Sequence, residues 1–172
     1  MSYIEETVVN GRLYEDANNF LGPVKITLPD VSYIMQTLKG IGIPGNIEYS
    51  IPGQIDAMTL GIDFQTFTRE QIRLSEPRRH NLTLMVSQQG EDTVAGELAY
   101  TAIKHIFIVT PKTDKAGSVE PATPSGGSGE YAVRYWATYI NGARVREIDP
   151  MNMIFYVNGT DYMAQVRKAL GM

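Results

Sequence analysis

The sequence of 172 residues contains no cysteine, only two histidines and a single tryptophan. The absence of cysteine excludes disulfides, thiolate metal sites and cysteine nucleophiles. Two histidines are fewer than most zinc hydrolase sites need. The longest stretches without a charge have eleven residues, well short of the roughly 20 that span a bilayer. The net charge of −4 argues against a protein that binds nucleic acid through contacts with its phosphates.

The first ten residues (MSYIEETVVN) carry two glutamates and no long apolar stretch. A secretory signal would have a basic start followed by an apolar core, so we expect a soluble chain made in a cytoplasm. The length is that of one domain, which we place over residues 1–172. A chain of this size can bury a core without disulfide or metal cross-links.

The abundance of glycine, tyrosine and β-branched residues favours strands separated by turns. Apolar and polar residues alternate most clearly over 57–67, which predicts a strand with Met58, Leu60, Ile62 and Phe64 on its buried face. The same alternation occurs over 82–87. Two longer segments, 97–109 and 130–140, are apolar on both faces for part of their length and also predict strands.

Three Asn-Gly pairs predict hairpin turns, at Asn10-Gly11, Asn141-Gly142 and Asn158-Gly159. The second pair follows the strand predicted over 130–140 and should lead into a return strand over 144–148. Residues 110–129 are rich in proline, glycine and serine and predict an exposed loop inserted between two strands.

The pattern of residues 161–170 predicts a helix, and a shorter helical turn is expected over 68–75. Thr160 or Asn158 could cap the C-terminal helix, and Gly171 is placed to end it. Its apolar stripe runs from Tyr162 through Val166 and should pack on the sheet.

No pattern of residues indicates a catalytic site, a cofactor or a metal. His105 lies within an apolar strand and is expected to be a hydrogen-bonded residue of the core or surface, and His80 follows two arginines in what reads as a solvated basic cluster. The segment Gly40–Gly45 superficially matches a phosphate-binding G-x-G-x-x-G loop, but Pro44 and the lack of a following helix argue against that function. The aromatic residues over 131–139 fit a core or an interface better than a base-stacking platform.

Charge is distributed unevenly along the chain. Residues 1–60 contain seven acids and three bases, whereas residues 61–172 contain twelve of each. The whole net charge therefore lies in the first third.

The segment 139–172 resembles the closing segment of major tail tube proteins from contractile-tailed phages and pyocin-like particles. The N-terminal half agrees more loosely, at 20–22, 26–29, 39–45 and 55–58, and residues 70–129 agree only in their order of strands and loops. The matching C-terminal residues are Gly142, Glu147, Ile148, Asp149, Pro150, Asn152, Asn158, Gly159, Asp161, Arg167, Leu170 and Gly171.

This resemblance implies a mainly β fold, a β-sandwich or half-barrel with one flanking C-terminal α-helix and an extended interlocking hairpin. Six copies would form a ring, and stacked rings would form a hollow tube inside a contractile sheath. Such a virion component would be assembled in the host cytoplasm. Its partners would be its own copies, the sheath, baseplate and tail terminator proteins, and the tape measure protein and DNA passing through the lumen without specific binding.

The resemblance also assigns roles to segments of this chain. Residues 40–54 would form the hairpin that reaches a neighbouring subunit, and the basic side of the C-terminal helix, at Arg167 and Lys168, would face the sheath. If the N-terminal strands line the lumen, Glu48, Asp56 and Asp63 would face the cargo and repel DNA. The hairpin residues are Gly40, Gly42, Pro44, Gly45, Ile47, Tyr49 and Ile51.

Three alternatives stay open. The chain could be the tube subunit of a genome-free injection device, either pyocin-like or of type VI secretion, whose hemolysin-coregulated protein forms similar rings. It could be a monomeric β-barrel that holds an apolar ligand, with Trp136 and the tyrosines at its mouth. It could be an enzyme built on scattered carboxylates, although no constellation of residues favours one.

Overall fold

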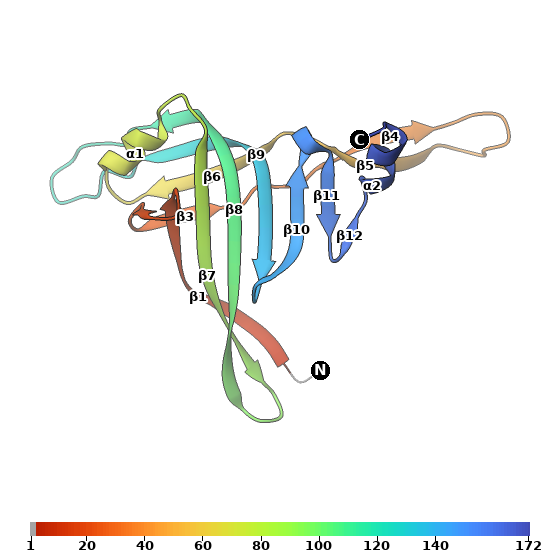
Figure 1. Cartoon of the computed structure of the whole chain (residues 1–172). Helices are drawn as coiled ribbons and strands as arrows, with labels where there is room; N and C mark the ends of the chain where they lie inside the picture. Colours follow the sequence, from red (N-terminus) through yellow and green to blue (C-terminus); the bar gives the residue numbers. More distant parts are fainter. Residues whose placement is uncertain (1–2) are drawn as a thin grey trace.

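A computed structural model describes residues 3–172. The chain forms one ten-stranded antiparallel sheet and a separate two-stranded sheet, with short helices at the periphery (Figure 1). The large sheet folds over on itself without closing into a barrel. This arrangement confirms the prediction of a mainly β fold of the sandwich or half-barrel kind. No helix in the described part of the chain is long and apolar enough to cross a membrane.

The strands and helices follow one another in this order: β1 (Tyr3–Glu15), β2 (Asn19–Phe20), β3 (Val24–Thr27), β4 (Tyr33–Leu38), β5 (Ile47–Ile55), β6 (Met58–Phe64), α1 (Arg69–Leu74), β7 (His80–Asp92), β8 (Glu97–Lys115), β9 (Ser128–Ile140), β10 (Ala143–Asp149), the 3₁₀ turn η1 (Pro150–Asn152), β11 (Ile154–Val157), β12 (Thr160–Asp161) and α2 (Ala164–Ala169).

Strand β9 is the branch point of the large sheet. Along one edge it pairs with β8, from Ile140 opposite Ile103 to Ser128 opposite Lys115. Along the other edge its first half pairs with β6 and its second half pairs with β10. The sheet therefore splits at β9 into a wing of β6 and β3 and a wing of β10, β11 and β12. Strands β7, β1 and β2 follow β8 on the far side.

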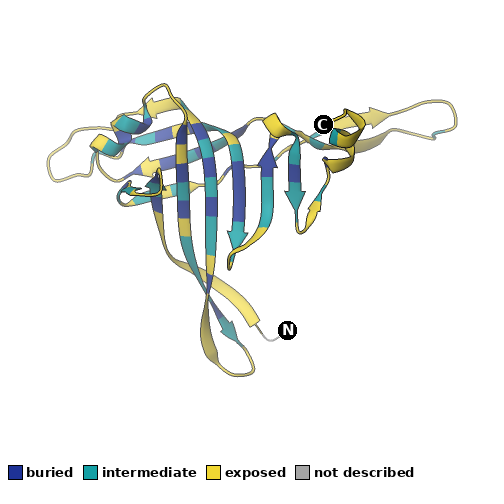
Figure 2. Cartoon of the chain, viewed as in Figure 1, coloured by how far each residue is buried: buried dark blue, intermediate teal, exposed yellow. Residues whose placement is uncertain are grey.

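The core lies between the folded halves of this sheet (Figure 2). The predicted alternation of β6 is confirmed, because its four apolar residues are buried while Asp63 is exposed. The rings of Phe107 and Trp136 stack with their centroids 5.7 Å apart. The largest fully buried apolar side chains are Trp136, Tyr131, Phe107, Leu13, Leu21, Leu60, Ile62, Leu74, Leu82 and Ile148.

Two of the three Asn-Gly pairs form the predicted turns. Asn141 and Gly142 have φ values of 48° and 81° and join β9 to β10, and Asn158-Gly159 joins β11 to β12. These positive φ angles match the type I′ turn that tight hairpins favour. The prediction for Asn10-Gly11 is wrong. Strand β1 runs straight through that pair, because both residues are held in register against β7.

The predicted loop over 110–129 is too long. Strand β8 continues to Lys115 and β9 begins at Ser128, so only residues 116–127 connect them. Proline is compatible with this extension because Pro111 lies next to a register shift in the ladder, where pairing is already interrupted.

The C-terminal helix is shorter than the predicted 161–170. Asp161 belongs to β12, and α2 begins after Met163 without a side-chain cap, so neither Thr160 nor Asn158 caps it. Its end follows the prediction. Gly171 has a φ of +76°, and the N–H of Met172 donates to the carbonyl of Arg167 at 3.0 Å, which closes a Schellman turn.

The prediction of a helical turn over 68–75 is confirmed. Helix α1 begins after Thr68, whose hydroxyl accepts a hydrogen bond from the N–H of Gln71, and it ends at Ser75, two residues before Pro77. The buried Gln71 amide donates to Asp114 at 3.2 Å and to the carbonyl of Lys115 at 3.1 Å. These bonds fix α1 to the end of β8.

His80 is fully buried, and its placement in a solvated cluster is therefore wrong. Its Nδ1 lies 2.6 Å from the carboxylate of Glu15, and its Nε2 lies 3.0 Å from the carbonyl of Glu76. Glu15 is also fully buried, and Arg73 and Arg78 each reach one of its oxygens at 3.0 Å. This network joins β1, β7 and α1. The sequence does not reveal it because the carboxylate and the imidazole are 65 residues apart.

Candidate assembly surfaces

One exposed apolar surface is the β4–β5 hairpin, which extends away from the body of the fold as a separate sheet (Figure 1). Leu38 lies opposite Ile47 and Gln36 lies opposite Tyr49. Because side chains opposite each other in a ladder share a face, Leu38, Ile47, Tyr49 and Ile51 form one face, which we call the apolar hairpin face. All four side chains are exposed, Leu38 by 47% and Ile47 by 53%, and most of the hairpin is coloured as exposed in Figure 2.

The residues predicted for the intersubunit hairpin divide between its tip and its second strand. Gly40, Gly42, Pro44 and Gly45 lie in the connecting loop, where Gly42 and Gly45 have φ values of +91° and +116° that favour glycine. Ile47, Tyr49 and Ile51 lie on β5. The predicted range of 40–54 omits β4, although the mostly apolar run 31–38 was a signal for it.

The three candidate lumen acids do not gather on one surface. Glu48 lies on β5, on the hairpin face opposite the apolar one, and Asp56 lies at the base of the hairpin. Asp63 lies on the outward face of β6, where it lines a shallow polar hollow with Thr59 and Glu130.

The two basic residues of α2 differ in their surroundings. Arg167 donates to the carboxylate of Asp161 and to the carbonyl of Met153, both at 2.6 Å, and so ties α2 to the β11–β12 hairpin. Burial opposes ionisation of Asp161, but hydrogen bonds from Arg167 and from two backbone N–H groups outweigh it and hold the pKa of Asp161 below its ordinary value. Lys168 is exposed and makes no ion pair in the described part of the chain.

The apolar stripe of α2 does not pack on the sheet as predicted. Met163 is buried against Gly53 of β5, but Tyr162 and Val166 are 52% and 42% exposed. The helix is shorter than expected, and it lies beside the base of the hairpin instead of over the core (Figure 1).

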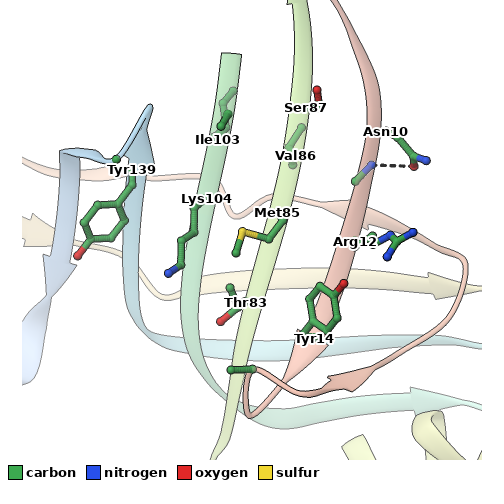
Figure 3. Close-up of a pocket in the computed structure, with 14 residues that line it drawn as sticks. Asn10, Arg12, Tyr14, Thr83, Met85, Val86, Ser87, Ile103, Lys104 and Tyr139 are labelled. Atoms are coloured by element: carbon green, nitrogen blue, oxygen red, sulfur yellow. Dashed lines mark hydrogen bonds between the residues drawn. The ribbon is translucent and has the colours of Figure 1, made fainter. Parts of the chain in front are cut away.

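Two further surfaces were not anticipated from the sequence. An open trough runs across β1, β7 and β8 to Tyr139 of β9, with the apolar Met85 beside Arg12 and Lys104 (Figure 3). The second is a three-stranded ribbon that extends beyond the body, built from residues 3–10 of β1, 87–92 of β7 and 97–102 of β8 (Figure 1). The two outer strands of this ribbon are largely exposed on both faces, and its middle strand is half-buried or buried along its whole length, so the period-2 signal of a half-buried strand is weak there.

The arrangement of His105 fits the hydrogen-bonded core residue expected from the sequence. Its Nδ1 lies 3.3 Å from the indole nitrogen of Trp136 and 3.0 Å from the hydroxyl of Thr138. An indole N–H can only donate, so Nδ1 is the acceptor and the ring is neutral. Burial, together with the charge of Arg146, lowers the pKa of His105 to about 4. Among the described residues no group of histidines and carboxylates could hold a metal ion.

We expect His105 to make the fold less stable as the pH falls from about 6.5 to about 4. In this range the unfolded chain takes up a proton on this imidazole that the folded chain does not. The stability lost should be on the order of 3 kcal/mol. Urea unfolding of the wild-type chain and of His105→Gln at pH 7 and pH 4 measures it, because the variant lacks the titrating group. A difference between the two chains that does not change with pH would contradict this expectation.

The comparisons with known proteins agree with this fold. A chain in the extended-state sheath–tube complex of PVC, an extracellular contractile injection system, is 12% identical, covers 76% of this chain and 88% of its own, and superposes with a TM-score of 0.53. A chain in the extended-state sheath/tube terminator structure of the same system is 11% identical, covers 76% of this chain and 94% of its own, and also has a TM-score of 0.53. No curated protein matches the chain.

The family model described as phage tail tube protein FII matches residues 5–171, which is nearly the whole sequence. This match confirms the resemblance to phage tail tube proteins found at the two ends of the chain. The chain belongs to the phage tail tube protein FII family.

Proposed function

We propose that the chain assembles into six-membered rings that stack into the hollow inner tube of a contractile tail. The tube would conduct DNA, or a protein effector in a particle without a genome. The family match supports a tube subunit. The similarity in fold to chains from sheath–tube and terminator structures supports a contractile system.

The observation that carries this proposal is the apolar hairpin face. A two-stranded hairpin is at best marginally stable by itself in water. This one extends from the body with Leu38, Ile47, Tyr49 and Ile51 exposed. An exposed apolar strand pair is an aggregation hazard unless a partner covers it. In a polymer of identical subunits, the neighbouring copy is that partner.

The remaining partners follow from a position inside a sheath. The outer wall of the tube would contact the sheath, with the exposed Lys168 as a candidate contact. The two ends would meet the baseplate and the terminator, and the lumen would hold the tape measure protein before DNA. The particle would be assembled in the host cytoplasm. The genome-free alternative is favoured by one observation, the similarity in fold to chains of an extracellular injection system.

Two observations argue against the alternative of a monomeric ligand-binding barrel. The sheet does not close, and Trp136, which would line the mouth of such a barrel, is only 2% exposed and packs in the core. The trough across β1, β7 and β8 is an open surface (Figure 3).

We place the outward face of β6 on the lumen wall. It carries Asp63 and Glu130 together with Lys115, Lys25 lies opposite Asp63, and Lys112 donates to Thr59. The two acids therefore offset the lysines and limit the attraction of this face for phosphates. Replacing Glu48 and Asp63 by lysine should leave tubes intact and slow DNA delivery, measured as infectivity or DNA ejection. Asp63→Lys alone separates the effect of the wall from that of the hairpin, and Glu120→Lys in the exposed 116–127 segment is the control. Unchanged delivery by both lysine variants would argue against this face as the wall.

Sedimentation of the purified protein over a range of concentrations tests the assembly itself. We expect a species of six times the monomer mass, with larger polymers at high concentration. A monomer at every concentration, whose melting temperature rises on adding an apolar ligand, would favour the ligand-binding alternative.

A further inference from the structure

Acidic residues gather at one end of the molecule. The three-stranded ribbon carries the carboxylates of Glu5, Glu6, Glu91, Asp92 and Glu97, and there is no lysine or arginine in residues 3–11 or 87–103. We call this ribbon the acidic arm. Exposed apolar side chains accompany the charges, including Val94 at 85% and Leu98 at 56%. The arm therefore resembles an interface more than a solvated loop.

Two unpaired arginines lie at the opposite end. Arg79 immediately precedes β7, and Arg134 lies on β9, and both line two adjoining shallow hollows. We call this surface the arginine end. Arg73, Arg78, Arg144 and Arg167 all form ion pairs with carboxylates, but Arg79 and Arg134 form none in the described part of the chain.

A β-bulge presents Arg134 at this surface. Ile108 pairs with Tyr135 and Val109 pairs with Val133, so Arg134 has no opposite residue in β8. A bulge re-aims the side chain of its extra residue, and Arg134 is exposed in a strand whose other residues, apart from Glu130, are buried or half-buried. The hollows around the two arginines also contain the apolar side chains of Ile108 and Met151. Asp149 lines one of them too, and its carboxylate accepts hydrogen bonds from Asn152. The surface thus offers both cations and apolar contacts.

The arm cannot reach the arginine end of its own chain. Strand β7 connects them directly, starting next to Arg79 and ending at Asp92 in the arm, and its 13 residues extend over about 40 Å at roughly 3.3 Å per residue. Any contact between the two surfaces must therefore join different copies. Because the two surfaces differ, the contact is head-to-tail and can propagate through a ring or a stack.

We propose that the acidic arm of one copy docks on the arginine end of a neighbouring copy in the assembled tube. This inference rests on the proposed tube function and names a contact separate from the apolar hairpin face. The carboxylates of the arm would pair with Arg79 and Arg134, while its exposed apolar side chains cover the hollows. Opposite charges at the two ends would also fix the polarity of assembly, since two arms or two arginine ends repel each other.

Charge reversal on each side, followed by mixing, tests this contact. The arm variant is Glu91→Lys with Glu97→Lys, and the end variant is Arg79→Glu with Arg134→Glu. We expect each variant alone to need at least tenfold higher protein concentration to form rings or tubes in sedimentation and electron microscopy. Mixing the two variants should restore assembly, because the basic arm of one chain fits the acidic end of the other. A chain carrying all four reversals should also assemble.

Controls separate this contact from folding and from the proposed function. Thermal unfolding of each variant monitors the fold, and Arg79→Gln with Arg134→Gln removes the charges without introducing new carboxylates near Glu15. Glu120→Lys reverses an exposed charge elsewhere and should assemble as the wild type does. If the wild type and both reversal variants assemble equally, or if mixing restores nothing, the docking contact is overturned and the tube function stands. A wild-type chain that never assembles would contradict both.

Discussion

Replacing Ile47, Tyr49 and Ile51 by serine, threonine and serine is expected to abolish assembly and leave a folded monomer. All three side chains lie on β5 with large exposed fractions and contribute nothing to the core cluster of the body. Burying a side chain of this size contributes roughly 1.5–3 kcal/mol. Losing three such contacts should therefore raise the concentration needed for assembly by at least about 100-fold.

The measurement is sedimentation of the triple variant beside the wild type, with the melting temperature of each in conditions that keep them monomeric. Thr37→Ser with Ser50→Thr alters the opposite face of the same hairpin and serves as the matched control. Rings formed by the triple variant at wild-type concentrations would show that another surface holds the subunits together.

Replacing Glu15 by alanine is expected to cost the fold about 3–5 kcal/mol, because it removes one partner from a buried charged network. The carboxylate is fully buried and contacts His80 at 2.6 Å and Arg73 and Arg78 at 3.0 Å. Without it, the buried Nδ1 of His80 has no hydrogen-bonding partner. Arg78 and Arg73 each lose one carboxylate and keep only Glu76 and Asp16, respectively. For a chain of this length the melting temperature should fall by about 6–20 °C.

Thermal unfolding of Glu15→Ala, with Glu5→Ala on the exposed part of the same strand as its control, measures this effect. Glu5→Ala should change the melting temperature by no more than a degree or two, since exposed substitutions rarely alter stability by more than about 0.5 kcal/mol. Equal melting temperatures for the two variants would mean that the network contributes little to folding.

Local patterns predicted the parts of the fold in which a short segment determines its own structure. The alternation of β6 gives its buried face directly, because one side of that strand packs in the core and the other does not. The Asn141-Gly142 turn follows from the backbone angles that these two residues tolerate. The C-terminal segment carried the family resemblance, and the family match over 5–171 confirms it.

Features that depend on distant segments were not predictable in this way. Asn10-Gly11 has the same local signal as Asn141-Gly142, but pairing with β7 on both sides of it keeps β1 extended. The burial of His80 depends on a carboxylate 65 residues away. Helix α2 loses its first residues because Asp161 pairs with Tyr156 in a hairpin.

The surfaces proposed for assembly were likewise only partly predictable from local sequence patterns. The hairpin loop was recognisable from its glycines, whereas the apolar run 31–38 did not by itself distinguish β4 from a loop or a core segment. The outer strand of the acidic arm, β1, gave no such signal. Both β4 and this part of β1 are mostly exposed on both faces in the single chain. A strand that becomes buried only against another copy lacks the simple alternation of a half-buried strand. Its apolar residues then resemble those of a loop or a core segment.

Electron microscopy of the purified full-length chain at high concentration tests the central claim most directly. The tube function predicts six-fold rings with an open centre, stacked into hollow tubes, with the β4–β5 hairpin of each subunit in contact with a neighbouring copy. Particles with no rotational symmetry at every concentration, or rings in which all hairpins extend freely into solvent, would contradict it.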